Sequence, residues 1–82
     1  MRIKMKDGRE FMGTPTQIVQ AMRGLAFASK ASLGDYIDHS VKQAESLMDV
    51  SMKITGTTDD EKAACLVSEM LRTELAQEIS NT

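Results

Sequence analysis

The chain has 82 residues, of which 41% are hydrophobic and 27% charged, as expected for a single small globular domain. Its one cysteine excludes an internal disulfide, and one cysteine with one histidine cannot complete a structural zinc site. No apolar run approaches the roughly 20 residues that span a bilayer, and the first residues lack the apolar core of a secretory signal. We therefore expect a cytoplasmic protein without a membrane partner.

Charge is distributed unevenly along the chain, although the net charge is only −2. Residues 1–30 carry six basic and two acidic groups, whereas residues 31–82 carry four basic and ten acidic groups. Such asymmetry occurs at interaction faces, and also in folds where two solvated surfaces offset each other. We favour the second interpretation.

Methionine is the most unusual feature of the composition, with seven residues against no tryptophan, one tyrosine and two phenylalanines. The flexible methionine side chain fills irregular gaps in a core, and it also lines adaptable binding surfaces. We favour core filling, although such a core specifies its packing less sharply than aromatic residues would.

The opening residues 2–13 predict a β-hairpin, because short alternating segments flank the turn sequence Lys-Asp-Gly. A two-residue loop at 7–8 would mix charged and apolar groups on both faces of the hairpin. A three-residue loop at 6–8, with its glycine left-handed, separates them, and a one-residue slip would turn the apolar set to solvent. We therefore expect the cross-strand pairs Ile3 with Phe11 and Lys4 with Glu10.

Three helices are predicted, each from an N-terminal cap followed by apolar residues at helical spacing. Thr14 is the first cap, Pro15 suits the first helical position, and Gln17 completes a capping box. Ser32 and Thr58 are the caps of the second and third helices. The helices are expected over about 15–27, 33–48 and 59–77.

The second helix has the cleanest periodicity in the chain. Its apolar stripe follows the i, i+3, i+4 spacing of a helix that packs one face against a core. The residues of this stripe, all expected to face the core, are Leu33, Tyr36, Ile37, Ser40, Val41, Ala44 and Leu47.

The stretch after the second helix changes its period. Val50, Met52 and Ile54 alternate with polar residues up to Gly56, which predicts a third strand over about 50–55. A lone two-stranded hairpin is marginally stable and gains from a third strand, which also favours this interpretation. The alternative is that the second helix continues to about Ile54.

These elements predict one α+β domain over residues 1–82, in the order β-β-α-α-β-α. The helices would cover one face of a short sheet, because their apolar stripes need a partner. The other sheet face, exposed or used for docking, would carry Lys4, Lys6, Glu10, Lys53 and Thr55.

No catalytic, metal or cofactor site can be assembled from the sequence. His39 has Asp35 one turn earlier, which favours a weak surface contact rather than a catalytic pair. Cys65 lies at the edge of a buried helix face. A reactive thiolate needs a basic environment, and Lys62 alone does not provide enough of one. The acidic residues 59–61 lack the alternating ligands of a calcium loop and are explained by helix capping. We therefore expect no enzyme activity, no metal and no cofactor.

Basic residues supply the candidate interaction surface, which consists of Arg2, Lys4, Lys6, Arg9 and Lys53. A two-stranded ribbon can enter a major groove, where its basic side chains contact phosphates. Against nucleic-acid binding, the chain is acidic overall and no aromatic residues are interleaved for base stacking. We therefore interpret the basic row as the solvated side of a hairpin.

The pattern RIKMKDGREFMGTPTQIVQAM, followed by SLGDYI and then TGTTDDE, resembles a type of short uncharacterised bacterial open reading frame. The likeness covers most of the chain and implies no activity, so it assigns no functional residue. The N-terminal strand is also similar to that of ribbon-helix-helix repressors, but here an Asp-Gly turn folds the ribbon back within one chain and three helices follow.

The sequence therefore favours a non-enzymatic protein-interaction module, acting as a homodimer or as an accessory or inhibitor protein. Its partner would be protein, either a second copy or another chain. The alternative hypothesis is a DNA-binding regulator that uses the basic N-terminal ribbon.

Overall fold

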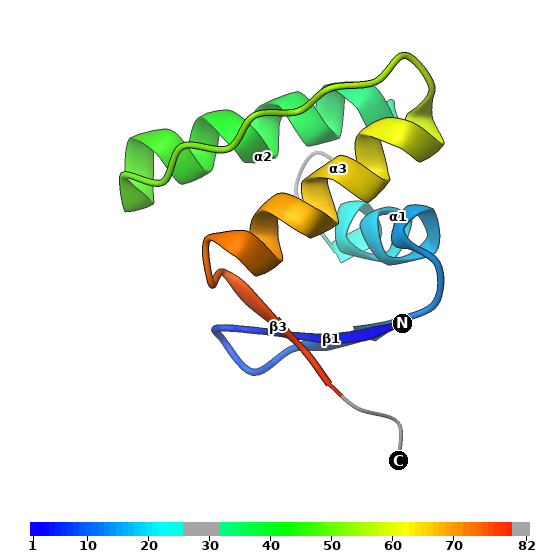
Figure 1. Ribbon diagram of the computed structural model, residues 1–82, viewed down its shortest axis with the longest axis vertical. Coiled ribbons are helices and arrows are strands. Elements are labelled where there is room, and N and C mark those ends of the chain that lie inside the picture. The colour runs from blue at the N-terminus through cyan, green and yellow to red at the C-terminus, as the bar shows by residue number, and fades with distance from the viewer. Residues whose placement is uncertain (26–31, 80–82) are drawn as a thin grey trace.

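The computed structural model describes residues 1–25 and 32–79, and within these ranges it contains three strands and three helices (Figure 1). The strands form one antiparallel sheet, so the expected α+β class is confirmed. In chain order the elements are β1 (Arg2–Met5), β2 (Glu10–Met12), α1 (Pro15–Leu25), α2 (Leu33–Met48), α3 (Asp59–Arg72) and β3 (Ala76–Glu78).

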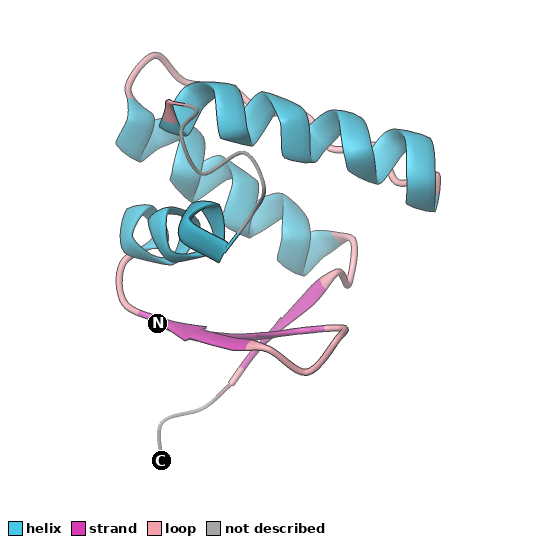
Figure 2. Ribbon diagram, turned by 180° about the vertical axis from the view of Figure 1, so that it is seen from behind, coloured by secondary structure: helices cyan, strands magenta, loops and turns pink. Residues whose placement is uncertain are grey.

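The three elements β2, β1 and β3 lie side by side in that order, so the basic strand β1 is the central strand of the sheet. Helices α1 and α3 pack against the strands on one side, and α2 lies across α1 and α3, away from the sheet (Figure 2). Two helices, α1 and α3, therefore cover one sheet face, whereas the sequence analysis expected all three to do so; α2 packs on these two helices instead.

The β1–β2 hairpin has the predicted three-residue turn at 6–8. The amide of Met5 donates to the carbonyl of Arg9 at 2.7 Å, and the amide of Gly8 donates to the carbonyl of Met5 at 3.0 Å. Gly8 has φ +95°, a conformation that costs glycine little and other residues more. The predicted pairs are confirmed, with Ile3 opposite Phe11 and Lys4 opposite Glu10.

The N-terminal caps form as the sequence predicts. The amide of Gln17 donates to Thr14 Oγ1 at 3.2 Å, and the amide of Thr14 donates to Gln17 Oε1 at 2.9 Å, which completes a reciprocal capping box. The hydroxyls of Ser32 and Thr58 each accept an amide hydrogen bond at 3.1 Å, at the starts of α2 and α3. These bonds satisfy amides that have no partner within their own helices.

Aliphatic side chains from the sheet and all three helices meet in one core. The largest fully buried side chains are those of Ile3, Ile18, Val19, Ile37, Leu66 and Val67. Met22, Met52 and Met70 are also buried, so core filling by methionine is confirmed for these three. No polar or charged residue is buried within the described ranges.

The end of α2 agrees with the predicted range 33–48, and the alternative in which this helix continues to Ile54 is wrong. Asp49 adopts a left-handed conformation with φ 53°, which stops the helix. The amides of Asp49 and Val50 then turn back to the carbonyl of Ala44. The first helix is described as far as Leu25, and positions 26–27 of its predicted range lie outside the described residues.

The predicted strand at 50–55 is wrong, because these residues join no sheet. The alternation is nevertheless real, since Met52 is buried while Val50 and Ile54 are partly buried against the core. The intervening backbone groups bind side chains of α3 instead of a neighbouring strand. Alternation of apolar and polar residues indicates an extended chain with one buried face. It does not show which groups form hydrogen bonds with the backbone of that chain.

The third strand is Ala76–Glu78, in a stretch predicted to be the end of a helix over 59–77. That helix stops at Arg72 because Glu74 adopts a left-handed conformation with φ 63°. The amides of Glu74 and Leu75 donate to the carbonyls of Leu71 and Met70 at 3.2 and 2.9 Å. This bonding is a Schellman motif, in which Leu75 also packs into the core. Glutamate replaces the usual glycine, so the sequence carries no stop signal there.

Replacement of Glu74 by glycine should stabilise the protein by about 0.5–1 kcal/mol, because a left-handed residue with a Cβ costs about 1–2 kcal/mol, partly offset by glycine's greater entropy when unfolded. Urea unfolding followed by circular dichroism measures this difference. The control is Ala64→Gly at an exposed position inside α3, which should cost about 1 kcal/mol. Destabilisation by both substitutions would contradict the left-handed turn at Glu74.

Candidate functional site

The basic row lies on the hairpin, and its two arginines are paired with carboxylates. Arg2 donates through Nε and Nη2 to Glu10 Oε1, at 3.0 and 2.5 Å. Arg9 donates through Nε to Asp7 Oδ2 at 2.7 Å, and its guanidinium lies 5.9 Å from the centre of the Phe11 ring. The amide of Arg9, followed by its side chain, also holds the pKa of Asp7 below its ordinary value. Half of the basic row is therefore engaged within the hairpin.

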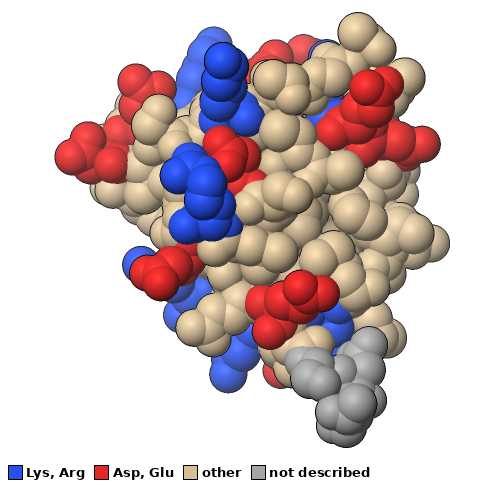
Figure 3. All heavy atoms as spheres, viewed as in Figure 1, with Lys and Arg blue, Asp and Glu red and all other residues tan. Residues whose placement is uncertain are grey.

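Lys4 and Lys6 are the remaining members of the row. Both are exposed, and within the described ranges their ammonium groups make no ion pair or hydrogen bond. They line an open hollow of about 290 Å³ with Glu74 and Gln77, at the seam between β1 and β3. On the face shown in Figure 3, basic and acidic side chains are interspersed, so this face carries no field of one sign.

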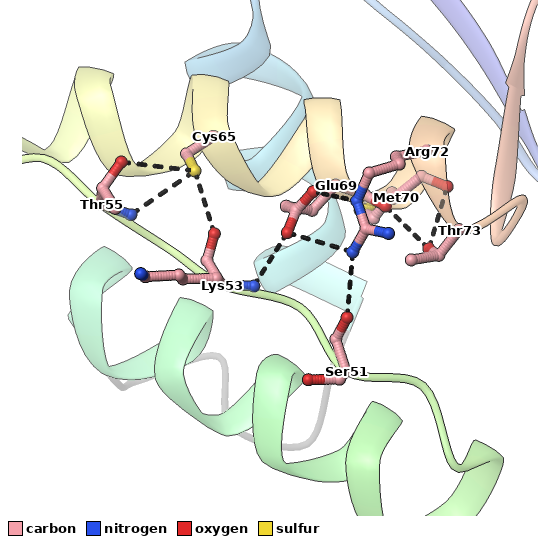
Figure 4. Close-up of polar contacts among 8 residues, drawn as sticks. All are labelled: Ser51, Lys53, Thr55, Cys65, Glu69, Met70, Arg72 and Thr73. Atoms are coloured by element: carbon pink, nitrogen blue, oxygen red, sulfur yellow. Dashed lines mark hydrogen bonds and ion pairs between the residues drawn. The ribbon is translucent and has the colours of Figure 1, made fainter.

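Lys53 is not part of the hairpin surface, and its predicted place on the sheet with Thr55 is wrong. It lies in the connection between α2 and α3, where its amide donates to Glu69 Oε1 at 2.9 Å (Figure 4). The structure therefore brings together four of the five candidate residues and separates Lys53 from them. The reason is that the 50–55 segment runs along α3 rather than along the sheet.

One flank of α3 provides polar partners for this extended segment (Figure 4). Cys65 Sγ donates to the carbonyl of Lys53 at 3.3 Å and accepts from the amide of Thr55 at 3.5 Å. Arg72 Nη2 donates to the carbonyl of Ser51 at 3.1 Å. Cys65, Glu69 and Arg72 are spaced i, i+4, i+7, which puts them on one helix face. From the sequence, this spacing could have indicated that the three side chains lie on one face of α3.

An ion pair strengthens the contacts between α3 and the 50–55 segment. Arg72 Nε donates to Glu69 Oε2 at 2.6 Å, and this ion pair is the main cause that lowers the pKa of Glu69 and raises the pKa of Arg72. The amide of Lys53 lowers the pKa of Glu69 further. The contacts with Arg72 and with the Lys53 amide therefore favour the ionised form of Glu69.

Stability should depend on the ionisation of Glu69. Because its pKa in the folded state lies below the ordinary value of 4.5, its contribution is present above that value and is lost as pH falls through the lowered pKa. Glu69→Gln should therefore unfold more easily than the natural protein at neutral pH. This deficit should shrink in acid, and urea unfolding at several pH values measures it.

A second variant tests the cause of the lowered pKa. Arg72→Gln removes the largest contribution, so the pKa of Glu69 should rise toward its ordinary value. A carboxyl-detected NMR titration of both proteins reads this shift directly. An unchanged Glu69 pKa in Arg72→Gln would contradict the geometry of Figure 4.

The residues considered from the sequence as possible catalytic or metal-binding groups lie in different parts of the structure. Asp35 and His39 form no ion pair or hydrogen bond with each other in the described part of the chain. Asp60 Oδ1 accepts a hydrogen bond from Thr16 Oγ1 at 2.6 Å, which joins the starts of α3 and α1. Across residues 1–25 and 32–79, no three His, Cys, Asp or Glu side chains gather closely enough to hold a metal ion.

A hollow that no pattern in the sequence indicates is lined by methionines from five places in the chain. It lies between the β1–β2 turn, the carboxyl half of α2 and the end of α3, and has a volume of about 190 Å³. We call it the methionine recess, and its methionines are Met5, Met22, Met48, Met52 and Met70. Met22, Met52 and Met70 form its buried floor, while Met5 and Met48 lie at its edge.

The recess continues outward into a second hollow of about 240 Å³. This outer part is lined by Met48 on α2 and by Leu75 after α3. At the hairpin it is lined by Met5, Lys6, Asp7 and Arg9. Four of these residues, Met5, Arg9, Met48 and Leu75, line both parts, so the two hollows are continuous. Together they form one open depression with a mainly apolar lining.

The last turn of α2 overhangs the methionine recess. In Figure 2 the carboxyl end of this helix projects past the end of α3 and beyond the hairpin turn. Leu47, predicted to be buried, is 77% exposed, and Met48 is 52% exposed. The prediction for Leu47 is wrong because helical spacing selects a face of a helix but does not say how far along the helix its packing partner extends.

We compared the chain with protein-family models, curated proteins and solved structures, and found no match. Among the described residues, no helix combines the length and apolar character needed to cross a bilayer.

Proposed function

We propose that this chain is a non-enzymatic protein-interaction module that binds protein at the methionine recess. The observation that carries the proposal is the apolar hollow together with the exposed side chain of Met48, which lines both of its parts. The neighbouring Leu47 is also exposed at this end of α2. A single exposed leucine is ordinary on a protein surface, but exposed apolar groups continuous with a groove indicate a docking site.

The residue type at the recess suits such a role. Methionine has three rotatable bonds and a polarisable sulfur, so its side chain can adapt to the shape of a partner. Met22, Met52 and Met70 form the buried floor, whereas Met5 is partly buried and Met48 is 52% exposed at the edge. Association would remove these apolar edges from water, which is the main driving force for protein association.

The proposal is tested by photocrosslinking from the edge of the recess. The photoreactive amino acid p-benzoylphenylalanine replaces Met48, and the protein is irradiated in cells that express the chain naturally. We expect covalent protein adducts, identified by mass spectrometry as a second copy or as another protein.

Met12 is the matched control position, because it is a methionine that is 72% exposed on the opposite, outer face of the sheet. The photoreactive group at Met12 should give few adducts. Equal yields from both positions, or no adduct from Met48, would contradict a docking site at the recess.

The alternative function proposed from the sequence, DNA binding, is supported by Lys4 and Lys6 alone. Arg2 and Arg9 are already paired with carboxylates of the hairpin. Strand β1 also has a neighbour on each side, so its row belongs to a three-stranded sheet rather than to a two-stranded ribbon. The major groove, about 12 Å wide, admits a helix or a two-stranded ribbon.

A DNA-binding function would require Lys4 and Lys6 to contact phosphates. The double variant Lys4→Glu with Lys6→Glu should then lose affinity for duplex DNA at least tenfold, and the affinity of the natural protein should fall steeply with salt. Fluorescence anisotropy with a labelled duplex at two salt concentrations measures both effects. We expect instead weak binding that the double variant leaves within a few-fold of the natural protein.

A further inference from the structure

We infer that residues 50–55 detach from α3 as a unit while the helices and the sheet stay folded, and that this detachment widens the methionine recess. The segment contributes Met52 to the floor of that recess. The value of a wider recess for binding rests on the proposed function, whereas the detachment depends only on the contacts that hold the segment.

Side chains of α3, rather than a neighbouring strand, hold the 50–55 segment (Figure 4). Three backbone groups that flank Met52 bind these side chains, which belong to Cys65, Glu69 and Arg72. Among the described residues, the amide of Val50 makes the segment's one hydrogen bond to another backbone group, at 3.1 Å. The bonds to α3 lie at the surface, where water can replace each of them at a modest cost. The segment therefore lacks the repeated backbone bonds that fix a strand in a sheet.

One buried side chain anchors the segment to the core. Met52 is 7% exposed, whereas Val50 and Ile54 are only partly buried. The buried side chains of α3, by contrast, are those of Ala63, Leu66, Val67 and Met70. A segment with few buried apolar contacts and surface hydrogen bonds opens at a lower free energy than the whole domain unfolds. We therefore expect the segment to open before α3 unfolds.

The connection that contains the segment is longer than the distance it spans. Helix α2 has 16 residues and is about 24 Å long. The start of α3 lies beside the start of α2, since a Cβ on Gly34 would lie 3.9 Å from Asp59 Oδ1. The connection 49–58 runs back along α2 (Figure 1), although it could span about 33 Å if fully extended. The segment can therefore leave α3 without any movement of the helices.

Detachment removes one part of the recess floor. Met52 lies there with Met22 on α1 and Met70 on α3, which stay in place when the connection moves. The hollow of about 190 Å³ then gains the space of one methionine side chain. An apolar group too large for the closed form can bind the open form, and such binding shifts the population toward detachment.

Oxidation of Met52 by hydrogen peroxide measures the detachment, because the sulfur reacts when it reaches solvent. The protein carries Cys65→Ser, which removes the thiol that peroxide would also attack. Ile3→Val, in the sheet on the far side of the helices from the segment, should increase the unfolded fraction about fivefold. Since detachment does not require unfolding, Met52 should be oxidised at the same rate with and without Ile3→Val. A fivefold faster oxidation in Ile3→Val would overturn the inference, because global unfolding would then be what exposes Met52.

A second variant tests the contacts that hold the segment. Glu69→Ala removes the acceptor of the Lys53 amide and the ion-pair partner of Arg72. Oxidation of Met52 should therefore become at least threefold faster, and circular dichroism checks that the variant is folded. An unchanged oxidation rate in folded Glu69→Ala would show that these contacts do not hold the segment, and the inference would fail.

A disulfide tests whether detachment widens the recess. Thr55 Oγ1 lies 3.9 Å from Cys65 Sγ, so Thr55→Cys can form a disulfide with the chain's one natural cysteine. The probe is the dye anilinonaphthalene sulfonate, which binds exposed apolar surface. The oxidised variant should bind the dye at least threefold more weakly than Thr55→Ser, which forms no disulfide. Met52→Ala, added to the oxidised variant, should restore binding because it opens the floor without detachment. Equal dye binding by the oxidised variant and Thr55→Ser would contradict the widening.

The oxidation and dye measurements need no partner protein, so they separate this inference from the proposed function. If both give the expected results while position 48 yields no crosslink, the segment detaches but the recess is not a docking site. If crosslinks form while the oxidation of Met52 follows the unfolded fraction, the docking site stands and the inference is overturned.

Discussion

The structure depends on the placement of α3, which supplies partners to most of the other elements. Its apolar face, with Ala63, Leu66 and Val67 almost completely buried, packs against α1 and α2 while its end leads directly into the third strand. Its polar flank holds the 50–55 segment through Cys65 and Glu69. One helix thus buries the apolar faces of two other helices and also forms hydrogen bonds with the backbone of a connection. It can do both because two faces of the same helix carry different side chains.

The course of the α2–α3 connection also explains why the methionine recess is open. The chain leaves α2 at Met48 and runs back along α2 toward the start of α3 (Figure 1). It therefore covers one side of α2 and leaves the other side of the last turn, with Leu47, exposed. The hairpin turn lies below that end but does not reach it, and the recess lies between them.

The methionines show how one residue type serves two purposes in a small domain. A chain of this length buries only roughly 60% of the surface exposed when it is unfolded, so a core and a binding surface lie close together. Here Met22, Met52 and Met70 belong to the core and form the floor of the recess at the same time. Methionine tolerates both settings because it packs well without a fixed shape.

The sequence by itself determined the features that depend on neighbouring residues: the hairpin register, the three caps and the start of α2. Turn chemistry and capping act over a few residues, so their signals are local. Tertiary structure decided the rest. Segment 50–55 has a strand's alternation, but α3 occupies its backbone groups. Residues 76–78 pair with β1 because the left-handed conformation of Glu74 ends α3 and redirects the chain. No glycine in the sequence indicates this turn. The recess could not be predicted, because its five methionines meet only when distant segments pack together.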